Sequence, residues 1–293
     1  MRRWKAIAKA TALEILSEPL SLLVLLAALS LAALAPAFHY HQFGEASRMA
    51  RDSGLSALFT CGTAIAIFGT VRSFRREMES GTAAMALSHP VSRTCFVLSK
   101  TIGAFFALLV FWAIVSLQTC IIVNGAEIGG MIASSKGDIA RLWGPSFSIG
   151  MAVIVLPLAI GAFLNRFLNF RFVPSAFALG LLTAFCGALY RMNGAMLLRL
   201  LPVQVLILIL CAVYLSASAA FAVRFKANAA VSSVSAVVAA SVPFIGNYYL
   251  SDALSDGGAV PWTYVAIAVA ALLPAVAAFG VLASVLFNER DVL

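Results

Sequence analysis

The repeated apolar runs constrain this chain more than any other feature of its sequence. Eight runs follow one another, and a helix needs roughly 17–25 mostly apolar residues to cross a bilayer. Because backbone polar groups in lipid must be satisfied within the segment, such runs predict transmembrane helices. We expect spans at about Leu20–Phe38, Leu55–Val71, Thr101–Val123, Phe147–Leu164, Val173–Tyr190, Val203–Val223, Ala229–Ile245 and Trp262–Leu286. The expected fold is an all-α, polytopic membrane helix bundle in a single domain, residues 1–293.

The seventh run, Ala229–Ile245, is the least hydrophobic of the eight. Small residues recur in it every four positions, at Ser232, Ala236 and Ala240, a spacing that lets helices approach closely. We interpret this run as a buried spanning helix. The alternative is a re-entrant hairpin formed by the sixth and seventh runs, which leaves six spans and keeps both termini on one side.

Composition and charge indicate a membrane protein with both termini in the cytoplasm. The 293 residues are 62% hydrophobic and 11% charged, with a formal net charge of +8. With eight spans and a cytoplasmic N-terminus, fourteen of the 20 Lys and Arg residues and six of the 12 acids fall inside. This asymmetry follows the positive-inside rule. The excess is spread over short membrane-proximal turns, so we expect the lipid bilayer of a bacterial-type inner (plasma) membrane as partner, and no nucleic acid.

Residues 1–18 precede the first span and predict an interfacial amphipathic helix. Trp4, Ile7, Thr11 and Ile15 fall near one face of such a helix, and basic residues accompany them. This distribution is typical of helices that lie between lipid and water. We therefore expect this helix on the cytoplasmic surface of the membrane.

The stretch Arg72–Lys100 lies between the second and third runs and is unusually long and charged. A connection between two helices needs only a few residues. This stretch carries four arginines, two glutamates and a lysine, and residues of turns and helix caps interrupt it. We therefore expect it to be a structured cytoplasmic segment that contacts something in water.

Local residue types predict the secondary structure of this cytoplasmic segment. A helix is expected to end near Glu79, because Gly81 permits backbone conformations that other residues resist. A short helix is expected over Ala83–Leu87, whose residues favour helix. Pro90 should end that helix, and Ser92 is a natural N-cap for the helix that enters the membrane next.

The same stretch resembles the segment between the second and third membrane helices of ABC-2-type exporter permeases. The resemblance rests on the pattern E-x-E-S-G-T-x-x-x-x-L-S-x-P-V-S-R-x-x-F-V-L-S-K, which runs from Glu77 to Lys100. Two weaker marks are Glu14 in the N-terminal helix and the end F-N-E-R-D-V-L. The matching positions of that end are Phe287, Arg290 and Asp291.

The resemblance implies the permease subunit of an ATP-driven ABC exporter. In that family the segment carries a coupling helix, which sits in a groove of a separate ATP-hydrolysing subunit. Two copies of this subunit are expected, with ATP and Mg in them rather than in this chain. A second permease copy or a homologue is expected to enclose the path. The residues implied at the ATPase-coupling interface are Glu77, Glu79, Gly81, Thr82, Met85, Leu87, Ser88, Pro90, Ser92 and Arg93.

Sequence motifs of several enzyme classes are absent. No G-x-x-x-x-G-K-[ST] phosphate loop, H-E-x-x-H zinc motif or G-x-S-x-G nucleophile elbow occurs. The five cysteines form no C-x-x-C pair and mostly lie in apolar runs, which indicates buried thiols. We expect a transport subunit rather than an enzyme, with no catalytic, cofactor-binding or metal-binding residue.

The sequence is also compatible with two other functions. These are an ion-coupled secondary transporter, and a membrane scaffold or anchor without transport. Proton-coupled transporters generally carry ionisable residues inside the membrane as relays. The predicted spans hold none in their middles. This favours energy supplied by an ATPase. The transported substrate is not indicated by any residue of the sequence.

Overall fold

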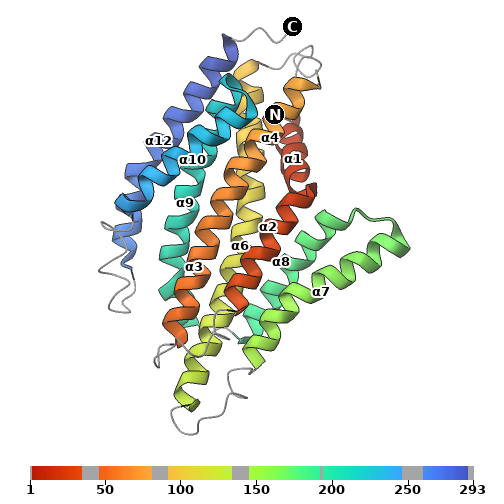
Figure 1. Ribbon diagram of the computed structural model, residues 1–293, viewed down its shortest axis with the longest axis vertical. Helices are drawn as coiled ribbons and strands as arrows, with labels where there is room; N and C mark the ends of the chain where they lie inside the picture. Colours follow the sequence, from red (N-terminus) through yellow and green to blue (C-terminus); the bar gives the residue numbers. More distant parts are fainter. Residues whose placement is uncertain are drawn as a thin grey trace. The chain divides into compact units, whose positions relative to one another are not determined.

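The computed structural model describes residues 2–34, 46–80, 92–133, 145–191, 194–245 and 260–289. Its regular elements in these ranges are all helices (Figure 1). They are α1 (Arg2–Ser17), α2 (Pro19–Leu34), α3 (Ala46–Ala64), η3 (Ile65–Gly69), α4 (Thr70–Glu79), α6 (Arg93–Ala133), α7 (Pro145–Leu168), α8 (Phe172–Arg191), α9 (Gly194–Arg224), α10 (Ala227–Ile245) and α12 (Trp262–Asn288). The predicted helical polytopic bundle is confirmed.

Six described helices are long and apolar enough to cross a membrane, and each corresponds to one of the predicted spans. They cover Ser47–Glu79, Arg93–Glu127, Ser148–Leu168, Phe172–Tyr190, Leu198–Arg224 and Trp262–Asn288. The first of these comprises α3, the π-helical turn η3 and α4 in unbroken succession. α6 reaches 41 residues, well beyond its apolar run, because its sequence contains no proline to stop it.

The first predicted span, Leu20–Phe38, corresponds to α2 as far as Leu34, and its last four residues lie outside the described part of the structure. α1 and α2 meet at a 64° bend, and they make one crossing only if the bent pair counts as a single span. Pro19 explains the break, because it lacks an N–H and disfavours helical geometry at Glu18 before it. The carbonyl oxygen of Glu18 then accepts the N–H of Ser21 at 3.1 Å and begins α2.

The seventh predicted span, Ala229–Ile245, corresponds to the helix α10 (Ala227–Ile245). α10 is 19 residues long, its described side chains end at Val238, and the part Asn228–Val238 is apolar, so the spanning helix and the re-entrant hairpin both stay predictions. The described residues provide six candidate spans, or seven with the bent pair.

Two residues of the predicted small-residue face, Ser232 and Ala236, are exposed, whereas Ala230 and Val234 are buried. The side chain of Ala240, the third, lies outside the described part of the structure. Packing of Ala230 against α4 and α9 decides which face of α10 turns inward.

Contacts between residues divide the chain into two compact units. Unit 1 comprises Met1–Ile15, Thr63–Leu109 and Val205–Leu293, and unit 2 comprises Leu16–Gly62 and Val110–Gln204. The core of unit 1 gathers parts of α4, α6, α9, α10 and α12. Its buried members are Val71, Phe74, Phe96, Val97, Ala219, Ala220, Ala222, Val223, Ala230, Ala283 and Phe287. The many alanines let these helices approach closely.

In unit 2, α7 and α8 pack against each other as a pair joined by a tight turn (Figure 1). The turn holds Asn169 at φ 56°, a left-handed conformation that asparagine adopts more readily than most residues. Asn165 Nδ2 donates to the carbonyl oxygen of Phe170 at 2.7 Å and fixes the turn. Most of the apolar surface of both helices is exposed, as a surface in contact with lipid requires.

Candidate functional site

The predicted coupling segment is bounded by two helix ends, both of which the sequence predicts correctly. α4 ends at Glu79 and α6 begins at Arg93. The N–H of Cys95 donates to Oγ of Ser92 at 3.2 Å, which is the N-cap expected of a serine. Several predicted residues lie outside the described part of the structure and stay predictions: Gly81, Thr82, Met85, Leu87, Ser88 and Pro90 in the segment, with Arg290 and Asp291 in the tail.

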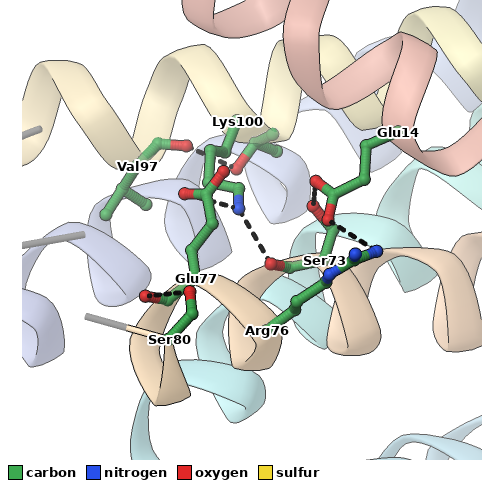
Figure 2. Close-up of polar contacts among 8 residues, drawn as sticks. Glu14, Ser73, Arg76, Glu77, Ser80, Val97 and Lys100 are labelled. Carbon is green, nitrogen blue, oxygen red and sulfur yellow. Dashed lines mark hydrogen bonds and ion pairs between the residues drawn. The ribbon is translucent and has the colours of Figure 1, made fainter. Parts of the chain in front are cut away.

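A lysine and a glutamate join α4 to α6 close to both ends of the segment. Lys100 Nζ lies 2.9 Å from Glu77 Oε2 and donates to the carbonyl oxygen of Ser73 at 2.9 Å (Figure 2). The Lys100 side chain is fully buried, whereas that of Glu77 is 27% exposed. Ser73 and Glu77 lie one helical turn apart, so a single ammonium group holds two successive turns of α4.

Two phenylalanine rings surround the ammonium group. Lys100 Nζ lies 5.1 Å from the ring centre of Phe74 and 5.9 Å from that of Phe96. The faces of aromatic rings attract cations, and the attraction grows when water is excluded. Burying a charge is costly unless it is paired and hydrogen-bonded. The carboxylate, the carbonyl oxygen and the two rings together allow this lysine to be buried.

Glu14 of α1 extends the cluster to a third helix. Ser73 Oγ donates to Glu14 Oε2 at 2.8 Å, and Arg76 Nη1 lies 4.0 Å from Glu14 Oε1 (Figure 2). The hydroxyl of Ser73 therefore bonds to α1, and its carbonyl oxygen accepts a hydrogen bond from α6. We call Glu14, Ser73, Glu77 and Lys100 the three-helix joint.

α1 also contacts α6 directly. A Cβ atom at Gly103 would collide with the carbonyl oxygen of Ala8 and lie 2.8 Å from Cβ of Thr11, so glycine permits this close approach. Ala8, Thr11 and Ile15 form the buried face of α1. The predicted N-terminal helix is confirmed, and its buried face packs on other helices of unit 1. Its location at the membrane surface stays a prediction.

Arg93 contacts the end of another helix in unit 1. Its Nη1 donates to the carbonyl oxygen of Asn288, the last residue of α12, at 3.1 Å. The rings of Phe96 and Phe287 stack nearby, with 5.6 Å between their centres. A guanidinium group at a helix C-terminus satisfies an unpaired carbonyl and interacts favourably with the helix dipole. The start of α6 and the end of α12 therefore meet beside the predicted interface.

The sequence predicts the helix ends that flank the coupling segment, but it does not predict the contacts of the three-helix joint. The sequence predicts Glu77 at the ATPase interface, whereas in the structure its carboxylate pairs with Lys100. Glu79, at the end of α4, pairs with Arg75 at 3.0 Å and remains exposed. Lys100 and Glu14 match the family resemblance, but no contact between them and other residues was predicted from the sequence. The available signal was a lysine placed directly before an apolar run, where a charge needs a partner.

A comparison with protein-family models gives a match over most of the chain. Residues 7–187 match a family described as "ABC-2 family transporter protein", and this range covers more than half of the chain and all of the three-helix joint. No curated protein and no solved structure matches the chain. The helices of spanning length agree with this family match. The chain therefore belongs to the ABC-2 family of transporter proteins, as an integral, multi-pass membrane permease component of an ABC transporter.

Proposed function

We propose that this chain is the permease subunit of an ATP-driven exporter and that residues 77–93 form the docking site for its ATPase. The ATPase is a separate subunit, present in two copies, that binds ATP and Mg. The main supporting observation is the Glu77–Lys100 ion pair, which braces the two helix ends that bound the segment. A plain connector has no need of a buried ion pair at its base. The direction of transport rests on the resemblance to exporter permeases.

The proposed mechanism is mechanical. ATP binding brings the two ATPase copies together, hydrolysis separates them, and the motion reaches the permease through residues 81–91. The ends of α4 and α6 receive it first, because the segment connects them. α4 continues through η3 into α3 as one helical stretch, Ser47–Glu79, so displacement of its end acts on a spanning helix. With a second permease copy or a homologue, such displacement switches the path between its inward- and outward-facing states.

The structure adds one observation that concerns the ion-coupled alternative. Lys100 is buried within the candidate span Arg93–Glu127, although its apolar run begins only after it. A relay group must exchange its proton during transport. The ammonium of Lys100 is held by Glu77 and Ser73, and the family match favours an ABC transporter. We therefore retain the ATP-driven function as the single proposal.

Purification of the tagged chain from its native membrane in mild detergent tests the proposed function. We expect an ATPase that contains a phosphate loop to co-purify, identified by mass spectrometry, and the complex to hydrolyse ATP. Gly81→Pro should abolish co-purification at normal permease abundance, because proline fixes its backbone angle and lacks an N–H. This substitution lies outside the spanning helices, so membrane insertion should be retained.

The matched control is Gly257→Pro, the same substitution in a loop predicted on the opposite side of the membrane. It should leave the amount of bound ATPase unchanged. Absence of any ATPase from the wild-type preparation would contradict the proposed function. Full binding and ATP hydrolysis with Gly81→Pro would instead show that the segment is only a linker.

A further inference from the structure

The three-helix joint gives Lys100 a role distinct from that of the residues expected to touch the ATPase. We propose that Lys100 is a positioning residue that locks the ends of α4 and α6 together, so that a displacement of residues 81–91 reaches α1 as motion of one body. The geometry of this latch is independent of the ATPase. Its consequence for transport rests on the proposed function.

The directional bonds of Lys100 support this role. Its ammonium group is held at two points of α4, the carboxylate of Glu77 and the carbonyl oxygen of Ser73, both at 2.9 Å. Two attachment points one turn apart resist both sliding and rotation of α4 against α6. Apolar contacts alone are non-directional and permit such movements at lower cost.

Burial makes the latch difficult to open. Lys100 is fully buried, so separation of α4 from α6 leaves a charge without its partner in an apolar core. An uncompensated buried charge is far less favourable than a paired one. The two helix ends therefore remain joined while a force acts on the segment between them.

α1 is attached to the same latch by a second set of bonds. Glu14 accepts the hydroxyl of Ser73 at 2.8 Å, and Ser73 is the residue whose carbonyl oxygen Lys100 holds. The close approach of Ala8 to Gly103 joins α1 to α6 as well. α1 therefore contacts both helices and moves with them rather than independently.

The competing explanation is that the ion pair only stabilises the fold. The double variant Glu77→Leu/Lys100→Met separates the two explanations, because apolar residues of similar size often replace a buried ion pair without loss of stability. This variant keeps the apolar contact between α4 and α6 and removes every directional bond of Lys100. Normal abundance in the membrane would show that it folds.

Distances between two spin labels measure the latch in the isolated permease. Labels are attached at Ser80→Cys and Leu98→Cys, two exposed positions on either side of the segment. The two native cysteines that are not buried are replaced by serine. Pulsed electron spin resonance then gives the distribution of distances between α4 and α6 without any ATPase.

We expect a narrow distance distribution in the otherwise native chain and a broader one in Glu77→Leu/Lys100→Met at equal abundance. The control is Glu127→Gln/Arg199→Gln, which removes an ion pair of unit 2 and should leave the distribution narrow. Equally narrow distributions in the native chain and the Leu/Met variant would overturn the proposal, because apolar packing would then suffice.

Hydrolysis by the co-purified ATPase measures the consequence of the latch. Because Glu77 itself belongs to the proposed docking site, turnover is measured per ATPase bound, and in the Leu/Met variant it should lose its dependence on the permease. Unchanged turnover would overturn the positioning role. Failure of the native chain to bind any ATPase would count against the proposed function alone, since the distance measurement still decides whether Lys100 locks the two helices.

Discussion

The two compact units bury polar side chains in different ways. Unit 1 buries a charge, since Lys100 is inaccessible to solvent and pairs with Glu77. Unit 2 buries neutral amides. Gln204 Nε2 donates to the carbonyl oxygen of Ser116 at 3.3 Å, and Ser116 Oγ donates to Oε1 of Gln204. Gln118, also fully buried, donates to a backbone carbonyl oxygen of α7 at 3.0 Å.

Neutral hydrogen bonds and a buried ion pair hold helices together with different energetic consequences. A neutral hydrogen bond between membrane helices contributes about 0.6–1.7 kcal/mol, so its loss leaves the helices paired. A buried ion pair behaves differently, because removal of one partner leaves the other charge unpaired at a cost of about 3–5 kcal/mol. In unit 1, loss of either partner of the ion pair therefore strongly destabilises the contact between the two helices. This contact lies next to the segment that is expected to receive force from the ATPase.

The largest effect is expected from Glu77→Leu. This single variant leaves Lys100 buried without its carboxylate, and it should destabilise the protein by about 3–5 kcal/mol. Thermal unfolding of the purified permease in detergent measures the change. Addition of Lys100→Met should recover most of the loss, since the two residues act as one unit. A mild effect of Glu77→Leu would remove the contrast between the two units.

An intermediate effect is expected from Gln204→Leu in unit 2. The substitution removes both side-chain hydrogen bonds with Ser116 but retains a backbone contact. Trp112 Nε1 donates to the main-chain oxygen of residue 204 at 2.8 Å, which leucine also provides. We expect a loss of about 1 kcal/mol in the same unfolding measurement. A loss as large as that of Glu77→Leu would mean that the amide cluster is also a rigid connection.

The smallest effect is expected from Glu127→Gln, which breaks the ion pair of Glu127 with Arg199. The two side chains are 4.0 Å apart, and that of Arg199 is 60% exposed. Exposed pairs of this kind contribute about 0–1 kcal/mol. The midpoint of unfolding should therefore stay close to that of the native chain. A large shift would show that burial is not what distinguishes the Lys100 pair.

Much of the fold is predictable because helix formation in membranes is governed by local sequence. Apolar length predicts eight spans, among them the six described helices of spanning length, and Ser92 predicts where α6 begins. The predicted packing face of α10 differs from the structure at Ser232 and Ala236 for a physical reason. Its small residues indicate a close packing face, but the neighbours available to Ala230 and Val234 decide which side is buried.

The candidate site divides in the same way. The sequence alone determined the helix ends that flank residues 81–91, because glycine and N-cap effects act over a few neighbouring residues. Only the tertiary structure decided that Lys100 meets Glu77 and that Ser73 meets Glu14, which is 59 positions away in the chain. Such pairs depend on the packing and rotation of whole helices, so no local pattern specifies them.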